Sequence, residues 1–199
     1  MDDISNKDSY DKIALRWTDE RKESFVSKLV IEFANEVKPF GRILDIGCGS
    51  GIPHAAYLCD KGFSLTGIDA SEKMIDIART NNFRNAIFEV CDVLEYNPPG
   101  TFEGILAWDS LFHLPYHQQD GIYQRIADWL NKGGWFLFSH RGADGEIIDD
   151  MFGEKFYYSG LSTNTVRQLL TDAGFEIKIM IEDYEERDMQ KGLVVIAKK

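Results

Sequence analysis

The stretch that decides the fold reads ILDIGCGSG and runs from Ile43 to Gly51. Its first half is an apolar strand that carries an acidic residue, Asp45, and its second half has glycine at every second position. Glycine has no Cβ atom, so the backbone of this loop can turn sharply and come close to a ligand. The residues that follow, IPHAAYLCDKG, suit a helix because proline is tolerated in a first turn. Free N–H groups where a helix begins favour an anion, and the stretch therefore predicts a nucleotide-type ligand.

The spacing of the glycines separates two kinds of nucleotide-type ligand. Dinucleotide-binding dehydrogenases carry the pattern G-x-G-x-x-G. Counted from Gly47, that pattern needs glycine at position 52, where this sequence has Ile52. The observed G-x-G-x-G, preceded by Asp45, resembles motif I of the class I S-adenosylmethionine-dependent methyltransferases. A glycine turn that only joins a strand to a helix is the alternative interpretation.

The rest of the chain alternates between predicted strands and helices. Two helices are expected over residues 5–37, and Ser71 is the expected N-cap of a helix in SEKMIDIART. Strands are expected at residues 42–46, 63–68, 86–91, 102–108 and 134–139. Alternation of this kind predicts a parallel sheet with helices on both faces.

The last two predicted strands, residues 175–181 and 193–197, break this alternation. The segment between them, EDYEERDMQKG, is short, charged and poorly amphipathic, whereas a parallel crossover usually needs a helix with an apolar face. We therefore expect an antiparallel hairpin, which resembles the methyltransferase sheet and differs from the dehydrogenase sheet. The predicted fold is an α/β, three-layer Rossmann-like sandwich with a seven-stranded, mostly parallel sheet and an antiparallel last strand.

Length and composition predict a single domain over residues 1–199. Hydrophobic residues make up 44% of the sequence and the formal net charge is −11, a balance that suits a globular protein and disfavours nucleic acid or an anionic membrane as partner. The three cysteines have no metal-ligand spacing, so neither a bound metal nor a disulfide framework is expected. The polar first residues and the lack of a long apolar run favour a cytoplasmic monomer or homodimer.

The resemblance implies roles for the acidic residues near the ends of three predicted strands. Asp69 corresponds to the family carboxylate that accepts hydrogen bonds from both ribose hydroxyls, and Asp45 to the residue that orients the methionine amino group. Asp92 corresponds to the residue that accepts from the adenine amine. Residues 1–38 are expected as helices that cover the cofactor. The cofactor-binding residues implied in this way are Asp45, Gly47, Cys48, Gly49, Gly51, Asp69, Ala70, Asp92, Val93, Trp108, Tyr10 and Trp17.

The segment FEGILAWDSLFHLP, residues 102–115, covers predicted strand four and its carboxyl end, where ligands bind in open α/β sheets. Its last residues are similar to those of small-molecule methyltransferases of the ubiquinone-biosynthesis-like type, which makes His113 the candidate catalytic residue, with loop packing as its alternative role. Residues 140–162 are expected to form a loop of the acceptor pocket. Candidate acceptor-binding residues are Asp109, His140, Tyr157 and Tyr158, with ordinary loop packing as the alternative role of the last three.

The predicted function is the transfer of a methyl group from S-adenosylmethionine to a small-molecule acceptor by in-line displacement. Alignment of the two reactants can lower such a barrier by up to about 7–11 kcal/mol. A base such as His113, with an ordinary pKa of about 6.5, adds to this only when the acceptor carries a proton. Two alternatives stay open: a non-catalytic cofactor-binding or regulatory protein of the same fold, and a nicotinamide-dependent oxidoreductase, which Ile52 and the terminal hairpin disfavour.

Overall fold

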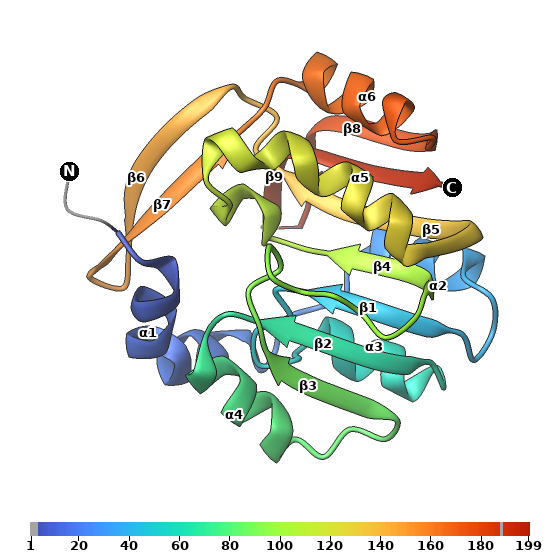
Figure 1. Cartoon of the computed structure of the whole chain (residues 1–199). Helices are drawn as coiled ribbons and strands as arrows, with labels where there is room; N and C mark the ends of the chain where they lie inside the picture. The colour runs from blue at the N-terminus through green and yellow to red at the C-terminus, as the bar shows by residue number, and fades with distance from the viewer. Residues whose placement is uncertain (1–3, 188) are drawn as a thin grey trace.

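A central seven-stranded sheet with helices on both faces organises the molecule (Figure 1). The computed structural model describes residues 4–187 and 189–199. In sheet order the strands are β3 (Ala86–Val90), β2 (Ser64–Asp69), β1 (Arg42–Ile46), β4 (Phe102–Ala107), β5 (Leu130–His140), β9 (Met189–Lys198) and β8 (Glu176–Glu186). The first five pair in parallel, and β9 runs antiparallel to both of its neighbours. The predicted fold class is therefore confirmed.

The helices cover the sheet in two layers because each buries one apolar stripe. On one face lie α2 (Lys28–Glu36), α3 (His54–Asp60) and α4 (Glu72–Thr80), and on the other lie α5 (Gln119–Trp129) and α6 (Thr163–Asp172). In α2 the buried side chains are Leu29, Val30, Phe33 and Ala34, which share one helical face. The predicted N-cap is confirmed, since the Ser71 hydroxyl accepts a hydrogen bond from the Met74 N–H at 3.1 Å.

The region expected as a pocket loop, residues 140–162, is for the most part a second, two-stranded sheet. Strands β6 (Gly145–Met151) and β7 (Glu154–Gly160) form an antiparallel hairpin that projects from the main sheet (Figure 1). Its turn holds Phe152 and Gly153, both with positive φ, at 59° and 87°. Consecutive residues of that kind match the twist of a tight hairpin, which is the physical reason that the expectation of a loop was wrong.

The terminal hairpin is confirmed, but it is longer than predicted. Strand β8 continues to Glu186 and β9 begins at Met189, so most of the charged segment is paired backbone. Near its tip the Tyr184 side chain is buried, and the Glu186 carboxylate accepts from the Ser27 hydroxyl at 2.7 Å and from the Lys28 N–H at 3.1 Å. The hairpin therefore also caps the start of α2.

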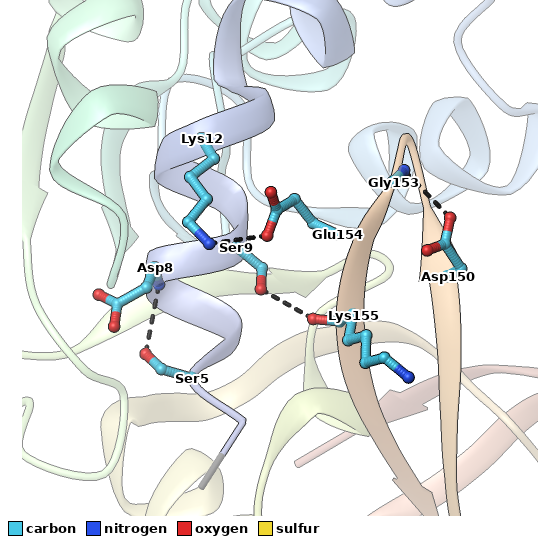
Figure 2. Close-up of polar contacts among 8 residues, drawn as sticks. All are labelled: Ser5, Asp8, Ser9, Lys12, Asp150, Gly153, Glu154 and Lys155. Carbon is cyan, nitrogen blue, oxygen red and sulfur yellow. Dashed lines mark hydrogen bonds and ion pairs between the residues drawn. The ribbon is translucent and has the colours of Figure 1, made fainter. Parts of the chain in front are cut away.

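The first helix, α1 (Asn6–Arg21), joins the main sheet to the small hairpin. Figure 2 shows the Ser9 hydroxyl donating to the Lys155 carbonyl of β7 at 2.7 Å, with the Lys12–Glu154 ion pair beside it. On its other side, the Asp11 carboxylate of α1 accepts from the Ser71 hydroxyl at 2.6 Å. Helix α1 is thus held over the carboxyl ends of the strands. Among the described residues, no helix combines the length and apolar character needed to cross a bilayer.

Candidate functional site

A cleft of about 1280 Å³ opens where β1, β2 and β4 end. Its other walls come from α1, from the β6–β7 hairpin and from the tip of the β8–β9 hairpin. All seventeen residues predicted for the site, from Tyr10 in α1 to Tyr158 in β7, line this cleft. The topology therefore brings together residues that are far apart in the sequence.

The glycine loop forms the floor of the cleft. Its N–H groups at Gly47 and Cys48 donate to the Ile68 carbonyl at 2.8 and 3.1 Å, which ties the loop to β2. The three glycines have φ of 70°, 53° and 79°, a region that side chains with a Cβ disfavour. A Cβ at Gly47 would lie 2.4 Å from the Ser110 Cβ. The Cys48 side chain packs into the core, so Cys48 presents only its backbone to the cleft.

The carboxylate of Asp69 holds this loop in place. One oxygen accepts from the Gly49 N–H at 3.0 Å and the other from the Ser71 N–H at 2.8 Å. Burial raises the pKa of Asp69 to about 6, although both hydrogen bonds favour the ionised form. Each carboxylate oxygen has a second lone pair, so Asp69 can still accept hydrogen bonds from a ligand.

Asp45 is a buried carboxylate that accepts no hydrogen bond from the described residues. Its exposed fraction is 4%, and within residues 4–187 and 189–199 no group donates a hydrogen bond to it. Burial, and then the negative charge of Asp69, raise the pKa of Asp45 to about 7. An ionised carboxylate in this position needs a cation, because an uncompensated buried charge is costly. The Ser110 hydroxyl, also on the cleft wall, is likewise buried without a partner among the described residues.

Arg21 is a cation that the sequence reasoning missed. Its guanidinium lies 3.8 Å from the centroid of the Trp17 ring, and no carboxylate of the described residues lies within ion-pair distance. Burial lowers the pKa of Arg21, which nevertheless stays charged. The available signal was the spacing, because Arg21 follows Trp17 by one helical turn and shares its face.

Tyr10 and His113 meet inside the cleft. The Tyr10 hydroxyl lies 2.9 Å from Nε2 of His113, and the ring's Nδ1 lies 3.0 Å from the Tyr157 carbonyl and 2.9 Å from Nδ2 of Asn6. Burial lowers the pKa of His113 to about 4, so its ring is neutral at physiological pH. The ordinary histidine pKa of about 6.5 therefore does not apply to His113 in the free protein. Burial also raises the pKa of Tyr10.

Asp109 sits in a strained position at the end of β4, with φ of 55°. Its N–H donates to the Ser139 hydroxyl at 2.8 Å, and that hydroxyl donates back to the Asp109 carboxylate at 2.9 Å. The second carboxylate oxygen pairs with the Lys191 ammonium at 2.6 Å. Sequence reasoning missed Lys191 because it comes from the far end of the chain. Next to Asp109, the buried Trp108 ring packs against His54.

The remaining predicted residues differ in how freely they face the cleft. His140 is 2% exposed, with Nε2 at 2.9 Å from the Gln119 side chain and Nδ1 accepting from the Gly142 N–H. The Tyr157 hydroxyl is bonded to Glu146 and to the Tyr116 N–H. Tyr158 is half-buried, with its ring 4.8 Å from that of His113.

The residues expected on the adenine side also line the cleft. Asp92 is exposed, and its carboxylate accepts from the Leu94 N–H at 2.9 Å. Its neighbours in the cleft, Ala70 and Val93, are half-buried. Among the described residues, no cluster of three or more His, Cys, Asp or Glu side chains could hold a metal ion.

A sequence profile described as a methyltransferase domain matches residues 18–178. The chain belongs to the methyltransferase domain family. It is 28% identical over 149 residues to the ubiquinone biosynthesis O-methyltransferase of Bordetella avium, covering 69% of this chain and 61% of the relative. It is also 28% identical over 179 residues to phosphoethanolamine N-methyltransferase 1 of Arabidopsis thaliana, covering 86% and 34%. The chain thus spans less than two thirds of these methyltransferases.

Solved methyltransferase structures share the fold. The magnesium protoporphyrin IX methyltransferase of Synechocystis with bound S-adenosylhomocysteine superposes with a TM-score of 0.74 at 17% identity, covering 97% of each chain. The 1,6-didemethyltoxoflavin-N1-methyltransferase of Burkholderia thailandensis gives 0.67 at 20% identity, covering 98% of this chain and 91% of the other. At these identities the likeness concerns the fold alone.

S-adenosylmethionine is the cofactor of class I methyltransferases, and the charges of the cleft fit it. The cofactor carries an amino group, a carboxylate and two ribose hydroxyls. Among the described residues, the cleft offers a buried carboxylate without a donor at Asp45, a guanidinium without an ion-pair partner at Arg21 and an accepting carboxylate at Asp69. Each polar feature of the ligand therefore has a complement on the protein.

Proposed function

We propose that this chain transfers a methyl group from S-adenosylmethionine to a small-molecule acceptor. The observation that carries the proposal is the pairing of a glycine loop, fixed to Asp69, with the buried carboxylate of Asp45 in one cleft. Membership of the methyltransferase domain family supports the same activity.

Cofactor binding is assigned by matching charge and hydrogen-bonding capacity. Asp69 would accept from the ribose hydroxyls, and Asp45 would pair with the amino group. Arg21, beside Tyr10 and Trp17, would bind the carboxylate. The adenine would lie against the neighbouring rim and the loop backbone, where the lining residues are Ala70, Asp92, Val93, Trp108, Gly47, Cys48, Gly49 and Gly51.

Bound S-adenosylmethionine supplies an activated methyl group that a nucleophile displaces in line. The protein's own contribution is alignment, and aligned reactants can gain up to about 7–11 kcal/mol. Acceptor and cofactor would meet beside His113, where Asp109 and Tyr158 also line the cleft. Strand β6 presents Ile147, Asp149 and Met151 to the same space through its period-two alternation.

Proton removal from an acceptor is assigned to Tyr10 and His113. His113 is the catalytic candidate, and its neutral ring can accept the Tyr10 proton through Nε2. Tyr10 would accept a proton from the acceptor in turn. We further propose that Asp109, His140, Tyr157 and Tyr158 shape the acceptor space, with His140 and Tyr157 acting from positions already hydrogen-bonded to the protein.

The acceptor class follows from the walls of the cleft and from the relatives. The names of two relatives refer to ubiquinone biosynthesis and to phosphoethanolamine, both of which concern small molecules. The net charge of −11 supports the further proposal that neither nucleic acid nor an anionic membrane is a partner. We also propose that the protein is a cytoplasmic monomer or homodimer. Size-exclusion chromatography with light scattering tests the oligomeric part, which a larger assembly would contradict.

The proposed activity is tested by incubating the protein with methyl-labelled S-adenosylmethionine and fractionated small-molecule extract. We expect the label in a low-molecular-weight product, identified by its mass, and a 1:1 calorimetric complex with S-adenosylmethionine. NAD and NADP serve as control ligands and should not bind. A tight complex with NAD, together with no response to S-adenosylmethionine, would overturn both the cofactor and the activity.

A further inference from the structure

Asn6, at the start of α1, clamps the backbone of Tyr157 in β7. The Tyr157 N–H donates to Oδ1 of Asn6 at 2.8 Å, and Nδ2 of Asn6 donates to the Tyr157 carbonyl at 2.7 Å. The two residues are 151 positions apart in the sequence. This two-way pairing fixes the orientation of the Asn6 amide, because a reversed amide would set donor against donor and acceptor against acceptor.

The same carbonyl also faces the ring of His113. Nδ2 of Asn6, Nδ1 of His113 and the Tyr157 carbonyl oxygen form a triangle with sides of 2.7, 2.9 and 3.0 Å. The two N–H bonds of an amide diverge more widely than two acceptors at such corners, so both hydrogen bonds of Nδ2 would be bent if Nδ1 were an acceptor. A carbonyl oxygen, in contrast, has two lone pairs and can accept from two donors. The arrangement therefore favours a proton on Nδ1 of His113, with Nε2 unprotonated and facing the Tyr10 hydroxyl.

We propose that Asn6 is a positioning residue that holds the Tyr157 carbonyl against His113 and thereby keeps the ring proton on Nδ1. Its catalytic consequence rests on the proposed function, whereas the position of the proton does not. With the proton on Nδ1, the Tyr10 hydroxyl donates to Nε2. In the other tautomer Nε2 would carry a proton and could accept nothing from Tyr10.

This tautomer permits one balanced proton path. The acceptor's X–H bond breaks and its proton forms an O–H bond at Tyr10, while the former hydroxyl proton of Tyr10 forms an N–H bond at Nε2 of His113. The electron pair left on the acceptor atom forms the new bond to the methyl carbon, while the bond from that carbon to the sulfonium sulfur breaks and its electron pair stays on the sulfur of the departing thioether. The Tyr157 carbonyl, held by Asn6, stabilises the resulting imidazolium through Nδ1–H. The negative charge of Asp109 also favours that charged form.

Ser9 provides a matched control, because it anchors the same helix to the same strand without contacting His113. Its hydroxyl donates to the Lys155 carbonyl at 2.7 Å, as Figure 2 shows. Loss of Ser9 therefore weakens the docking of α1 on β7 but leaves the Asn6 clamp in place. A difference between variants of Asn6 and Ser9 separates positioning from docking.

The test is a ¹⁵N NMR spectrum of the imidazole groups in the wild type, Asn6→Ala and Ser9→Ala, with His113→Gln used to assign the His113 signals. We expect a single Nδ1–H tautomer in the wild type and in Ser9→Ala, and a mixture of tautomers in Asn6→Ala. An Nε2–H tautomer in the wild type would overturn the proposal. An unchanged tautomer in Asn6→Ala, or the same change in Ser9→Ala, would overturn it as well.

Asn6→Asp keeps the proposal testable if the alanine variant is unstable. A carboxylate placed beside Nδ1 should hold a second proton on the His113 ring, and the negative charge of Asp109 acts in the same direction. The other rings packed on His113, those of Tyr10 and Tyr158, are neutral. We expect a doubly protonated His113 at neutral pH, a change opposite to that of Asn6→Ala and one that unfolding cannot produce. A neutral His113 ring in folded Asn6→Asp would contradict the proposal.

Kinetics then connect the tautomer with turnover. We expect Asn6→Ala to lower kcat by about tenfold or more, the lower part of the range for proton transfer, with KM for S-adenosylmethionine changed less than threefold. Ser9→Ala should keep kcat within about threefold. Equal kcat in Asn6→Ala and the wild type would remove the positioning role. If the wild type transfers no methyl group, the proposed function fails, while the NMR spectra still decide where the His113 proton lies.

Discussion

The two sides of the cleft are built in different ways. On the side proposed for the cofactor, the glycine loop Gly47–Gly51 supplies backbone from consecutive residues and is tied to Ile68 and Asp69. The opposite side consists of side chains from distant segments, such as Tyr10 with His113, 103 positions apart, and Asp109 with Lys191, 82 positions apart. A defect in the first side should remove binding, whereas a defect in the second should remove turnover and leave binding intact.

The strongest way to break this comparison is Gly47→Ala. The backbone at this position is left-handed, with φ of 70°, which costs a residue with a Cβ about 1–2 kcal/mol. The added Cβ would also lie 2.4 Å from the Ser110 Cβ. Overpacking of that kind adds about 1–3 kcal/mol. We expect calorimetric binding of S-adenosylmethionine to be lost, with a lower Tm. Gly133→Ala is the control, because φ is 81° there and an added Cβ would meet nothing within 4 Å. Binding that is retained in Gly133→Ala and lost in Gly47→Ala fits the proposal.

The second side is tested by His113→Ala. Removal of a positioned proton acceptor typically costs about 10²–10⁴-fold in rate, so kcat should fall by that order while affinity for S-adenosylmethionine stays within a few-fold. The exposed His117 lies outside the cleft, and His117→Ala should change neither quantity. Full activity of His113→Ala on a protonated acceptor would show that alignment alone carries the reaction.

The difference between the two sides also explains what the sequence could predict. The glycine loop is a local pattern, in which backbone conformation follows from residue types at fixed spacing. The parallel sheet and the final antiparallel strand follow from the order of apolar segments and from a connection unsuited to a crossover. These features need no knowledge of distant contacts.

The second side could be predicted only in part, because its contacts are made by tertiary docking. Asn6 is the first residue of an ordinary helix, and nothing near it in sequence reveals a partner in β7. Lys191 lies in a segment that was expected to be a connection and that is instead part of strand β9. A strand with one exposed face can carry as many charged residues as a loop, so charge alone did not distinguish the two. The neutral ring of His113 follows from burial, which a sequence does not display.

A smaller effect is expected from Asp69→Ala, which sharpens the assignment of the cofactor side. Loss of a charge-assisted hydrogen bond costs about 1.5–3 kcal/mol, which corresponds to roughly 10–150-fold weaker binding of S-adenosylmethionine by calorimetry. Asp69 also holds the loop through Gly49, so we expect a modest fall in Tm as well. Asp69→Asn retains one accepting oxygen and should lie between alanine and wild type. Unchanged affinity in Asp69→Ala would place the ribose elsewhere.

The finest test uses pH and the carboxylate of Asp45, whose pKa burial and the charge of Asp69 raise to about 7. The cationic amino group of the cofactor stabilises the ionised form of Asp45, so the pKa of Asp45 is lower in the complex than in the free protein. Below pH 7 the free Asp45 carries a proton, and cofactor binding releases it. Linkage then requires affinity to fall by up to about tenfold for each pH unit below that value. Asp69, with a pKa of about 6, steepens the loss at lower pH.

The free protein should respond in the opposite direction, which makes the titration of Asp45 diagnostic. A carboxyl whose pKa is raised by folding contributes stability at low pH, and this contribution is lost as pH rises through about 7. Between about pH 5.5 and 8 we therefore expect affinity for S-adenosylmethionine to increase while the contribution of Asp45 to Tm decreases. Calorimetry in two buffers of different ionisation enthalpy measures the released proton. Asp45→Asn should abolish both trends near pH 7, and a pH-independent affinity in the wild type would show that the amino group is bound elsewhere than at Asp45.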